Sequence, residues 1–248
     1  MLPQPDPVTT SWTVALKARE EIAQGTLALR FDKPAGFRFK PGQAIDLTLL
    51  NPSETDAKGA RRAFSLVSAP SESELTVATR LRDSAFKRTL TTATMGTRFQ
   101  LDGPFGSLLL HSTRSRPAIF IAGGIGITPF ISILRQATTD RLPQNLFLFY
   151  ANRRPEEAAF LPELSELEKR NGHFRLFATM TQMHNAHRGW TGPTGRITWA
   201  SINAIAGQLS MPIYYVVGPP AMVAATREML NAAGVNDDDI RSEDFSGY

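Results

Sequence analysis

The spacing of the apolar residues changes near the middle of the chain. Up to about His111, apolar and polar residues alternate in short stretches that are separated by proline and glycine. Successive side chains of a strand point to opposite faces, so this alternation predicts antiparallel strands. The predicted strands cover residues 13–19, 25–31, 44–49, 63–68, 74–81 and 97–101. We therefore expect an antiparallel Greek-key β-barrel, interrupted by a polar loop over 51–61 and a short helix over 84–92.

The second half of the chain alternates predicted strands with predicted helices. The strands cover 118–122, 146–150, 174–179, 213–217 and 240–245, and the helical stretches include 156–170 and 221–233. Such alternation is typical of a parallel sheet covered by helices. We place the domain boundary after residue 112. The chain then consists of a barrel domain over 1–112 and an α/β parallel-sheet domain over 113–248.

Composition narrows the class of protein. The apolar runs fall well short of the roughly 20 residues that span a bilayer, and the first residues lack the basic start and apolar stretch of a signal peptide. The absence of cysteine excludes a thiolate-ligated iron–sulfur cluster within these residues and fits a reducing compartment. The net charge is only +4 and the basic residues are dispersed, which argues against nucleic-acid binding. We expect a soluble cytoplasmic protein without membrane or nucleic-acid partners.

A glycine-rich segment, Gly-Gly-Ile-Gly-Ile-Thr-Pro over 123–129, follows an apolar predicted strand and precedes an apolar stretch with helical spacing. Backbone N–H groups at the start of a helix point outward, and the helix dipole favours an anion there. Glycine also removes the Cβ that would keep a pyrophosphate away from the backbone. The segment is not a Walker loop, since no Gly-Lys-Ser/Thr follows it. It predicts a phosphate-binding turn; the alternative is a tight turn whose glycines only permit close packing.

A second strand-to-helix turn, Gly218-Pro219-Pro220, follows the predicted strand 213–217. Pro220 suits the first turn of a helix, where a missing N–H costs nothing. By itself this turn is typical of a structural connection. In open α/β sheets, however, ligands bind beyond the carboxyl ends of the strands, where both glycine segments fall. We therefore expect both segments to border one nucleotide site.

A third motif, Arg62-Ala63-Phe64-Ser65, lies on a predicted barrel strand. Arg62 and Phe64 share one face of that strand, and Ala63 and Ser65 share the other, because side chains alternate. A guanidinium can donate two hydrogen bonds to a pyrophosphate, and a phenyl ring can lie against a flat ligand ring. An edge strand with a surface arginine and a core phenylalanine is the alternative. Combined with the two glycine segments, the motif favours a nucleotide that carries a flat ring.

The three motifs, in this order, resemble those of the ferredoxin–NAD(P)+ reductase superfamily over essentially the whole chain. That family has Arg-x-Tyr/Phe-Ser, Gly-Gly-x-Gly-x-Thr-Pro and Cys-Gly-Pro-Pro, and Val217 stands in place of the cysteine here. The resemblance implies an FAD-binding barrel and an NAD(P)H-binding domain. It also implies that Arg62 holds the FAD pyrophosphate, with Phe64 beside the flavin and ribityl chain and Ser65 near flavin N5.

The resemblance implies further site residues. Contacts to FAD are expected from Arg62, Ala63, Phe64 and Ser65, and from Thr79, Arg80, Ser84, Ala85, Phe86 and Lys87 near its phosphates. Contacts to NAD(P)H are expected from Gly123, Gly124, Gly126, Thr128, Pro129, Gly218, Pro219 and Pro220. Arg153 and Arg154 lie where relatives meet the adenine ribose, and their guanidiniums suit a 2′-phosphate, although the choice between NADPH and NADH stays open. Glu243 and Phe245, with Ser65, are the expected catalytic residues of the nicotinamide pocket; a solvated acidic tail, or Tyr248 as the stacking ring, is the alternative.

The implied activity is hydride transfer from NAD(P)H to FAD, followed by single-electron transfer to a ferredoxin or flavodoxin-like acceptor. We expect a monomer. A reductase component of an oxygenase system, or a reductase of free flavins or quinones, keeps the same fold and stays open. A nucleotide-sensing or docking subunit without turnover is the alternative of another class. No metal site is expected, because His184 and His187 lie in a predicted loop with no third ligand nearby.

Overall fold

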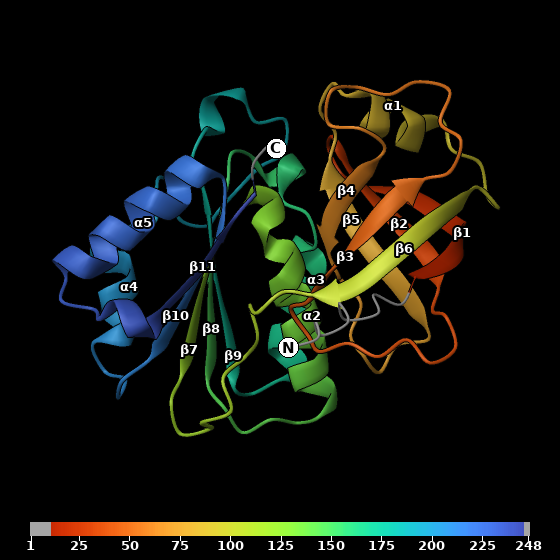
Figure 1. The fold of residues 1–248 in the computed structure, drawn as a ribbon. Coiled ribbons are helices and arrows are strands. Elements are labelled where there is room, and N and C mark those ends of the chain that lie inside the picture. The colour runs from red at the N-terminus through yellow and green to blue at the C-terminus, as the bar shows by residue number, and fades with distance from the viewer. Residues whose placement is uncertain (1–10, 246–248) are drawn as a thin grey trace, which may run out of the picture.

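Six strands in the first half of the chain form one antiparallel sheet. The computed structural model describes residues 11–245. The strands are β1 (Ser11–Ala23), β2 (Thr26–Asp32), β3 (Ala44–Leu49), β4 (Arg61–Ser65), β5 (Glu74–Arg80) and β6 (Arg98–Phe105), in the order β4-β3-β6-β1-β2-β5. Just beyond β4, Leu66 pairs with Val77 of β5, which joins the two outer strands and closes the sheet into a barrel-like shape (Figure 1). The predicted antiparallel barrel is confirmed.

Large apolar side chains fill the inside of this barrel. Phe31 and Phe99, for example, are fully buried and meet edge to face with their ring centroids 5.4 Å apart. The short helix α1 (Ala85–Thr92) covers one end of the barrel and inserts Phe86 into the same core. Ser84 caps this helix, because its hydroxyl accepts a hydrogen bond from Lys87 N at 3.2 Å. The start of α1 is therefore fixed against the barrel, close to β4.

Five strands in the second half form a parallel sheet. They are β7 (Ala118–Gly123), β8 (Leu146–Asn152), β9 (Phe174–Met180), β10 (Ile213–Gly218) and β11 (Ile240–Asp244), in the order β11-β10-β7-β8-β9. Strands β7 and β10 are buried along their whole length, which accounts for their continuous apolar sequences. The predicted α/β parallel sheet is confirmed.

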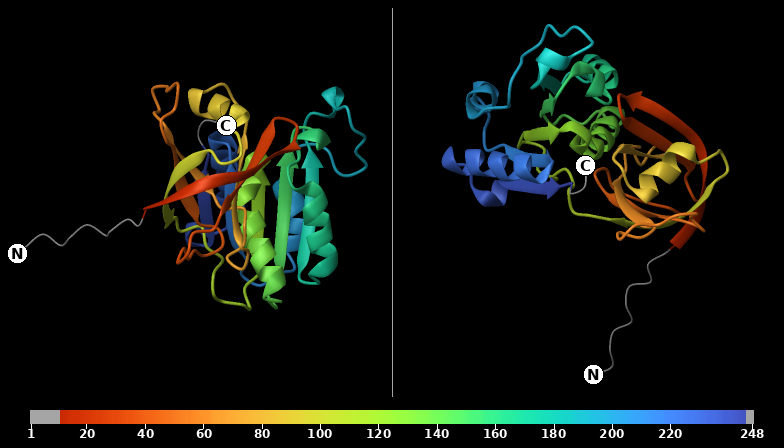
Figure 2. Two further views of the ribbon diagram at one scale, coloured as in Figure 1. Left: turned by 90° about the vertical axis from the view of Figure 1, so that its right-hand side faces the viewer. Right: turned by 90° about the horizontal axis from the view of Figure 1, so that it is seen from above.

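Helices cover both faces of the parallel sheet (Figures 1 and 2). Helices α2 (Thr128–Thr139) and α3 (Leu161–Arg170) pack on the face toward the barrel, whereas α4 (Trp199–Ala206) and α5 (Pro220–Ala232) pack on the opposite face. Single turns of 3-10 helix are η1 (Gly124–Ile127), η2 (Pro155–Glu157), η3 (Met183–Asn185) and η4 (Asp237–Asp239). Helix α4 has no counterpart among the elements predicted from the sequence.

The predicted helix over 156–170 is wrong in its first part. The chain forms η2 and a turn there, and α3 begins only at Leu161. Phe160, the residue before α3, has a φ of 61°, in the left-handed region that a right-handed helix cannot continue through. As a result Glu156 and Glu157 lie outside the helix, and both are buried.

Polar contacts fix α2 against the barrel. The Ser132 hydroxyl donates a hydrogen bond to Ser68 O at 2.7 Å. The guanidinium of Arg135 lies 3.3 Å from the Glu72 carboxylate of the barrel side and 2.6 Å from Glu163 of α3. These contacts give the two sheets a defined mutual orientation. Along the chain, β6 is the last strand of the antiparallel sheet and β7 the first of the parallel sheet, and a domain boundary after residue 112 stays a prediction.

No helix within residues 11–245 is long and apolar enough to cross a membrane.

Candidate functional site

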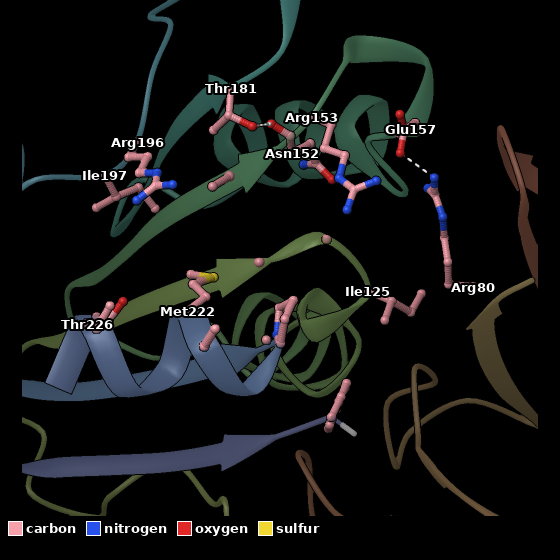
Figure 3. Close-up of a pocket in the computed structure, with 18 of the residues that line it drawn as sticks. Arg80, Ile125, Asn152, Arg153, Glu157, Thr181, Arg196, Ile197, Met222 and Thr226 are labelled. Carbon is pink, nitrogen blue, oxygen red and sulfur yellow. Dashed lines mark hydrogen bonds and ion pairs between the residues drawn. The ribbon is translucent and has the colours of Figure 1, made fainter. Parts of the chain in front are cut away.

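A pocket of about 530 Å³ lies at the carboxyl ends of the parallel strands and is also lined by barrel residues (Figure 3). Of the residues predicted from the sequence, its wall contains Arg80, Gly123, Gly124, Arg153, Gly218, Pro219 and Phe245. Both glycine segments therefore border one site, as the topology predicts. The other predicted residues lie outside this wall: Arg62, Ala63, Phe64, Ser65, Thr79, Ser84, Ala85, Phe86, Lys87, Gly126, Thr128, Pro129, Arg154, Pro220 and Glu243.

The charged residues of this wall are mainly basic. Arg80, Arg82, Arg153 and Arg196 line it, and the acidic lining residue among those that the structure describes is Glu157. Guanidiniums in a partly enclosed pocket favour an anionic ligand that can accept several hydrogen bonds. The wall thus fits the phosphates of a dinucleotide.

The glycines of the first turn have two different roles. Gly124 has a φ of +53° and lies against open space, so it lets the backbone turn beside the pocket. A Cβ on Gly126 would lie 2.4 Å from Val217 O, so this glycine permits close packing of the turn on β10. Thr128 likewise points inward, because its hydroxyl donates to Ile125 O at 3.0 Å. Gly124 therefore leaves room for a phosphate, whereas Gly126 and Thr128 hold the turn in place, as does Gly123, on which a Cβ would lie 2.1 Å from Met222 Sδ.

The second turn connects β10 to α5 and is tied to the end of β11. The backbone N–H of Phe245 donates to Gly218 O at 2.9 Å, and both residues line the pocket. Glu243 pairs with Val217 in the β10–β11 register. Burial, with a smaller effect of neighbouring Asp244, raises the pKa of Glu243 above its usual range. Tyr248, the alternative stacking ring, lies outside the described residues.

The two arginines after β8 are placed differently. Arg153 is exposed and lines the pocket (Figure 3). Arg154 forms an ion pair with Glu157 instead, and its Nη1 donates to Asn185 O at 3.5 Å. The residue that accompanies Arg153 in the wall is Arg196, which the sequence did not single out. It follows an irregular connection after β9, where no local pattern indicates its position.

Arg62 binds an internal carboxylate on the barrel side. Its Nη2 donates to both oxygens of Asp56, at 2.8 and 3.1 Å. The backbone N–H of Ala85, the first residue of α1, donates to the same carboxylate at 3.1 Å. A guanidinium and a helix N-terminus therefore converge on one anion, which is the donor set that a phosphate needs.

The rest of the first motif packs on the barrel. Arg62 and Phe64 share a face, as the alternation predicts, because the Arg62 guanidinium lies 5.2 Å from the Phe86 ring and Phe64 lies 5.9 Å from the same ring. Phe64 is only 3% exposed and belongs to the barrel core. Ser65 is also buried, and Ala63 is exposed. A position of Phe64 and Ser65 beside a flavin stays a prediction.

Lys87 links the Arg62 region to the pocket. Its Nζ donates to the carbonyl oxygen of Arg80, a residue of the pocket wall, at 2.7 Å. Burial, with a smaller effect of the nearby charges of Arg82, Arg62 and Lys58, lowers the pKa of Lys87 to about 8. Several cationic groups thus lie close together beside the pocket, which fits an anionic cofactor. Residues 11–245 contain no cluster of histidine and acidic side chains that could hold a metal ion.

Comparison with known proteins identifies the family. Residues 120–228 match the oxidoreductase NAD-binding domain. The chain is 32% identical over 248 residues to the electron transfer component of 2-halobenzoate 1,2-dioxygenase from Burkholderia cepacia, covering 96% of this chain and 68% of the relative. It is 28% identical over 239 residues to the reductase component of propane 2-monooxygenase from Rhodococcus jostii, covering 92% of this chain and 61% of the relative. The fold resembles that of a ferredoxin NADP+ reductase from Neisseria gonorrhoeae, with a TM-score of 0.77, 22% identity and coverage of 94% and 98%.

The family match lies in the second half of the chain, whereas the matches to the two relatives extend over both halves. The chain belongs to the ferredoxin–NAD(P)+ reductase superfamily, a group of oxidoreductases that use FAD and a nicotinamide nucleotide. It spans about three fifths of the length of the propane 2-monooxygenase reductase component, so segments of such relatives have no counterpart here.

Proposed function

We propose that the chain is an NAD(P)H-dependent flavin reductase that passes single electrons to a separate acceptor. Residues 1–112 are proposed to bind FAD, and residues 113–248 to bind NAD(P)H. The observation that carries this proposal is the basic pocket at the carboxyl ends of the parallel strands. Arg80 of the barrel and Gly124 of the glycine turn both line it. A pocket shared in this way lets a nucleotide on one domain reach a cofactor on the other.

The barrel residues are proposed to hold the FAD phosphates. Arg62 and the N–H of Ala85 already bind a carboxylate, and Lys87 lies between them and the pocket. When bound, FAD supplies a hydride acceptor that releases electrons one at a time. Ser65 and Phe245 are proposed to position the two rings and exclude water. Glu243 is proposed to act beside them, because it pairs with Val217 next to the Gly218 turn and because burial raises its pKa, which favours its protonated form.

The parallel-sheet residues are proposed to hold NAD(P)H. Gly123, Gly124 and Gly218 would leave room for the pyrophosphate beside the two turns. Arg153 and Arg196 would contact the adenine ribose. Two guanidiniums at that end favour a 2′-phosphate, and so NADPH. Arg196 is proposed to contact the ribose in place of Arg154, because Arg154 forms an ion pair with Glu157.

The acceptor is proposed to be a protein of an oxygenase system or a small ferredoxin. The relatives from Burkholderia cepacia and Rhodococcus jostii are the electron transfer and reductase components of oxygenases, which supports the oxygenase alternative. Since these 248 residues contain no cysteine, a thiolate-ligated cluster would have to lie outside them. A flavodoxin, free flavin or quinone is the competing acceptor.

The test is anaerobic stopped-flow mixing of the FAD-loaded protein with NADPH or NADH. The flavin absorption should bleach and then return when an acceptor is added. Ferredoxins, oxygenase components, flavodoxins, free flavin and quinones are compared as acceptors at equal concentration. If FAD binds but its absorption never bleaches, the chain would instead be a nucleotide-sensing or docking subunit without turnover.

A further inference from the structure

We propose that Asp56 is an internal anion that occupies the phosphate-binding point of the flavin site, so that FAD must displace it in order to bind. This inference rests on the proposed function, since it concerns the same FAD site. It identifies a residue that sets FAD affinity by competition and that none of the motifs contains.

The geometry around the Asp56 carboxylate is that of a bound anion. Oδ1 accepts hydrogen bonds from Arg62 Nη2 at 2.8 Å and from Lys58 N at 2.9 Å. Oδ2 accepts from Arg62 Nη2 at 3.1 Å and from Ala85 N at 3.1 Å. Partial burial works against ionisation here, but these hydrogen bonds and the charge of Arg62 outweigh it and lower the pKa of Asp56. The carboxylate is therefore ionised at neutral pH and takes the place of a phosphate oxygen pair.

The surrounding charge favours exchange for a stronger anion. Lys58, Arg62 and Arg82 lie close enough to Lys87 for their charges to lower its pKa. Asp56 brings one negative charge to this group, whereas the pyrophosphate of FAD brings two together with more acceptor oxygens. The Asp56 carboxylate thus accepts the hydrogen bonds of Arg62, but it neutralises less of the positive charge of these cations than the FAD pyrophosphate would.

The segment that carries Asp56 lies outside the paired part of the sheet. Asp56 lies between β3 and β4, and the β3–β4 pairing starts at Thr48 and Arg61. A second anchor of the segment is the ion pair between Glu54 and Arg88 at 2.9 Å, on the exposed side of α1. Withdrawal of the Asp56 carboxylate would break its hydrogen bonds with Arg62, Lys58 and Ala85. The hydrogen bonds that Arg62 donates to Lys58 O and Gly59 O, and the strand register, would stay intact.

The experiment measures FAD retention by the full chain. The protein is loaded with FAD and diluted, and the fluorescence of the released flavin gives the dissociation constant. If Asp56 blocks the site for nine tenths of the time, Asp56→Asn should tighten FAD binding about tenfold, because the competent fraction rises to nearly one. Asp56→Ala should act in the same direction, which guards against a folding defect of either variant alone.

Asp83→Asn is the matched control. It removes one negative charge near the same cations but from an exposed ion pair with Arg88 and from outside the segment that carries Asp56, so FAD affinity should change by less than about twofold. Equal tightening by Asp83→Asn and Asp56→Asn would overturn the proposal, because the effect would then be one of general charge. Weaker FAD binding by both Asp56 variants would also overturn it, since Asp56 would then hold Arg62 in its binding position.

The same titration separates this inference from the proposed function. If neither the wild type nor the Asp56 variants retain FAD, the proposed flavin reductase itself is refuted. If all of them retain FAD with one affinity, the reductase stands and only the competing role of Asp56 is rejected.

Discussion

The guanidinium of Arg80 and the carboxylate of Glu157 form an ion pair that joins the barrel to the parallel-sheet domain at the wall of the pocket. Figure 3 shows the two side chains pointing toward each other from opposite sides. Glu157 also pairs with Arg154, so one carboxylate that is 4% exposed binds two guanidiniums. The pair therefore contributes both to the contact between the domains and to the charge of the site.

Glu157→Gln should destabilise the protein substantially. The substitution leaves Arg80 and Arg154 without their shared carboxylate, and breaking a buried pair on one side costs roughly 3 kcal/mol. Urea unfolding followed by circular dichroism measures the loss. Glu166→Gln, which removes an exposed partner of Lys169, is the control and should cost less than about 0.5 kcal/mol. Equal effects of the two substitutions would contradict a structural role for the Arg80–Glu157 pair.

Arg196→Ala should raise the Michaelis constant for NADPH more than that for NADH. A charge-assisted hydrogen bond to a 2′-phosphate contributes about 1.5–3 kcal/mol, which corresponds to roughly a 10–100-fold selective loss. Arg153→Ala should act in the same way, because both side chains line the pocket. Arg154→Ala is the comparison and should not distinguish the two nucleotides, since its guanidinium is bound to Glu157. Steady-state kinetics with both nucleotides decide this, and equal losses at Arg196 would remove it from the specificity site.

FAD affinity should fall as the pH rises above about 8. The pKa of Lys87 is lowered to about 8 by burial and neighbouring cations, so Lys87 loses its proton there in the FAD-free protein. A phosphate beside it would raise this pKa, so binding above pH 8 takes up a proton and weakens by up to about tenfold per pH unit. Lys87→Arg stays charged and should flatten the profile measured by FAD fluorescence. An unchanged pH dependence in that variant would place Lys87 away from the phosphates.

Much of this architecture follows from short-range patterns in the sequence. The alternation that places Arg62 and Phe64 on one face is a property of any strand, and both do lie against Phe86. The glycine segments fall at carboxyl ends of parallel strands, so the topology alone brings Gly124 and Gly218 to one pocket.

The remaining features depend on contacts that are distant in the sequence. Arg153 and Arg154 are neighbours and look equivalent, yet Glu157 binds only the second. Arg196 reaches the wall from an irregular segment whose path depends on packing. Asp56 lies in a polar loop, and its role becomes visible only when the start of α1 is placed beside it.

The stability of the fold should fall as the pH is lowered below about 6.5, the ordinary pKa of histidine. His111 is buried against the parallel-sheet domain, where its Nδ1 lies 2.9 Å from the Tyr215 hydroxyl and its Nε2 lies 2.9 Å from Arg116 O. Burial lowers the pKa of His111 below 6.5; the hydrogen bond to Arg116 O opposes this, and the charge of Arg241 adds to it. The folded protein therefore holds His111 neutral, whereas the unfolded chain takes up a proton near pH 6.5.

The sign of this effect follows from proton binding. Because the unfolded state binds more protons in this range, the contribution of His111 is fully present above about pH 6.5 and is lost as the pH falls through the lower folded pKa. The slope is at most about 1.4 kcal/mol per pH unit, measured by urea unfolding between about pH 5 and 7. His111→Gln should reduce the slope of the unfolding free energy against pH. His184→Gln, at an exposed position, should leave that slope unchanged. If His111→Gln keeps the full slope, the acid sensitivity arises from other groups, and the buried link between His111 and Tyr215 does not control it.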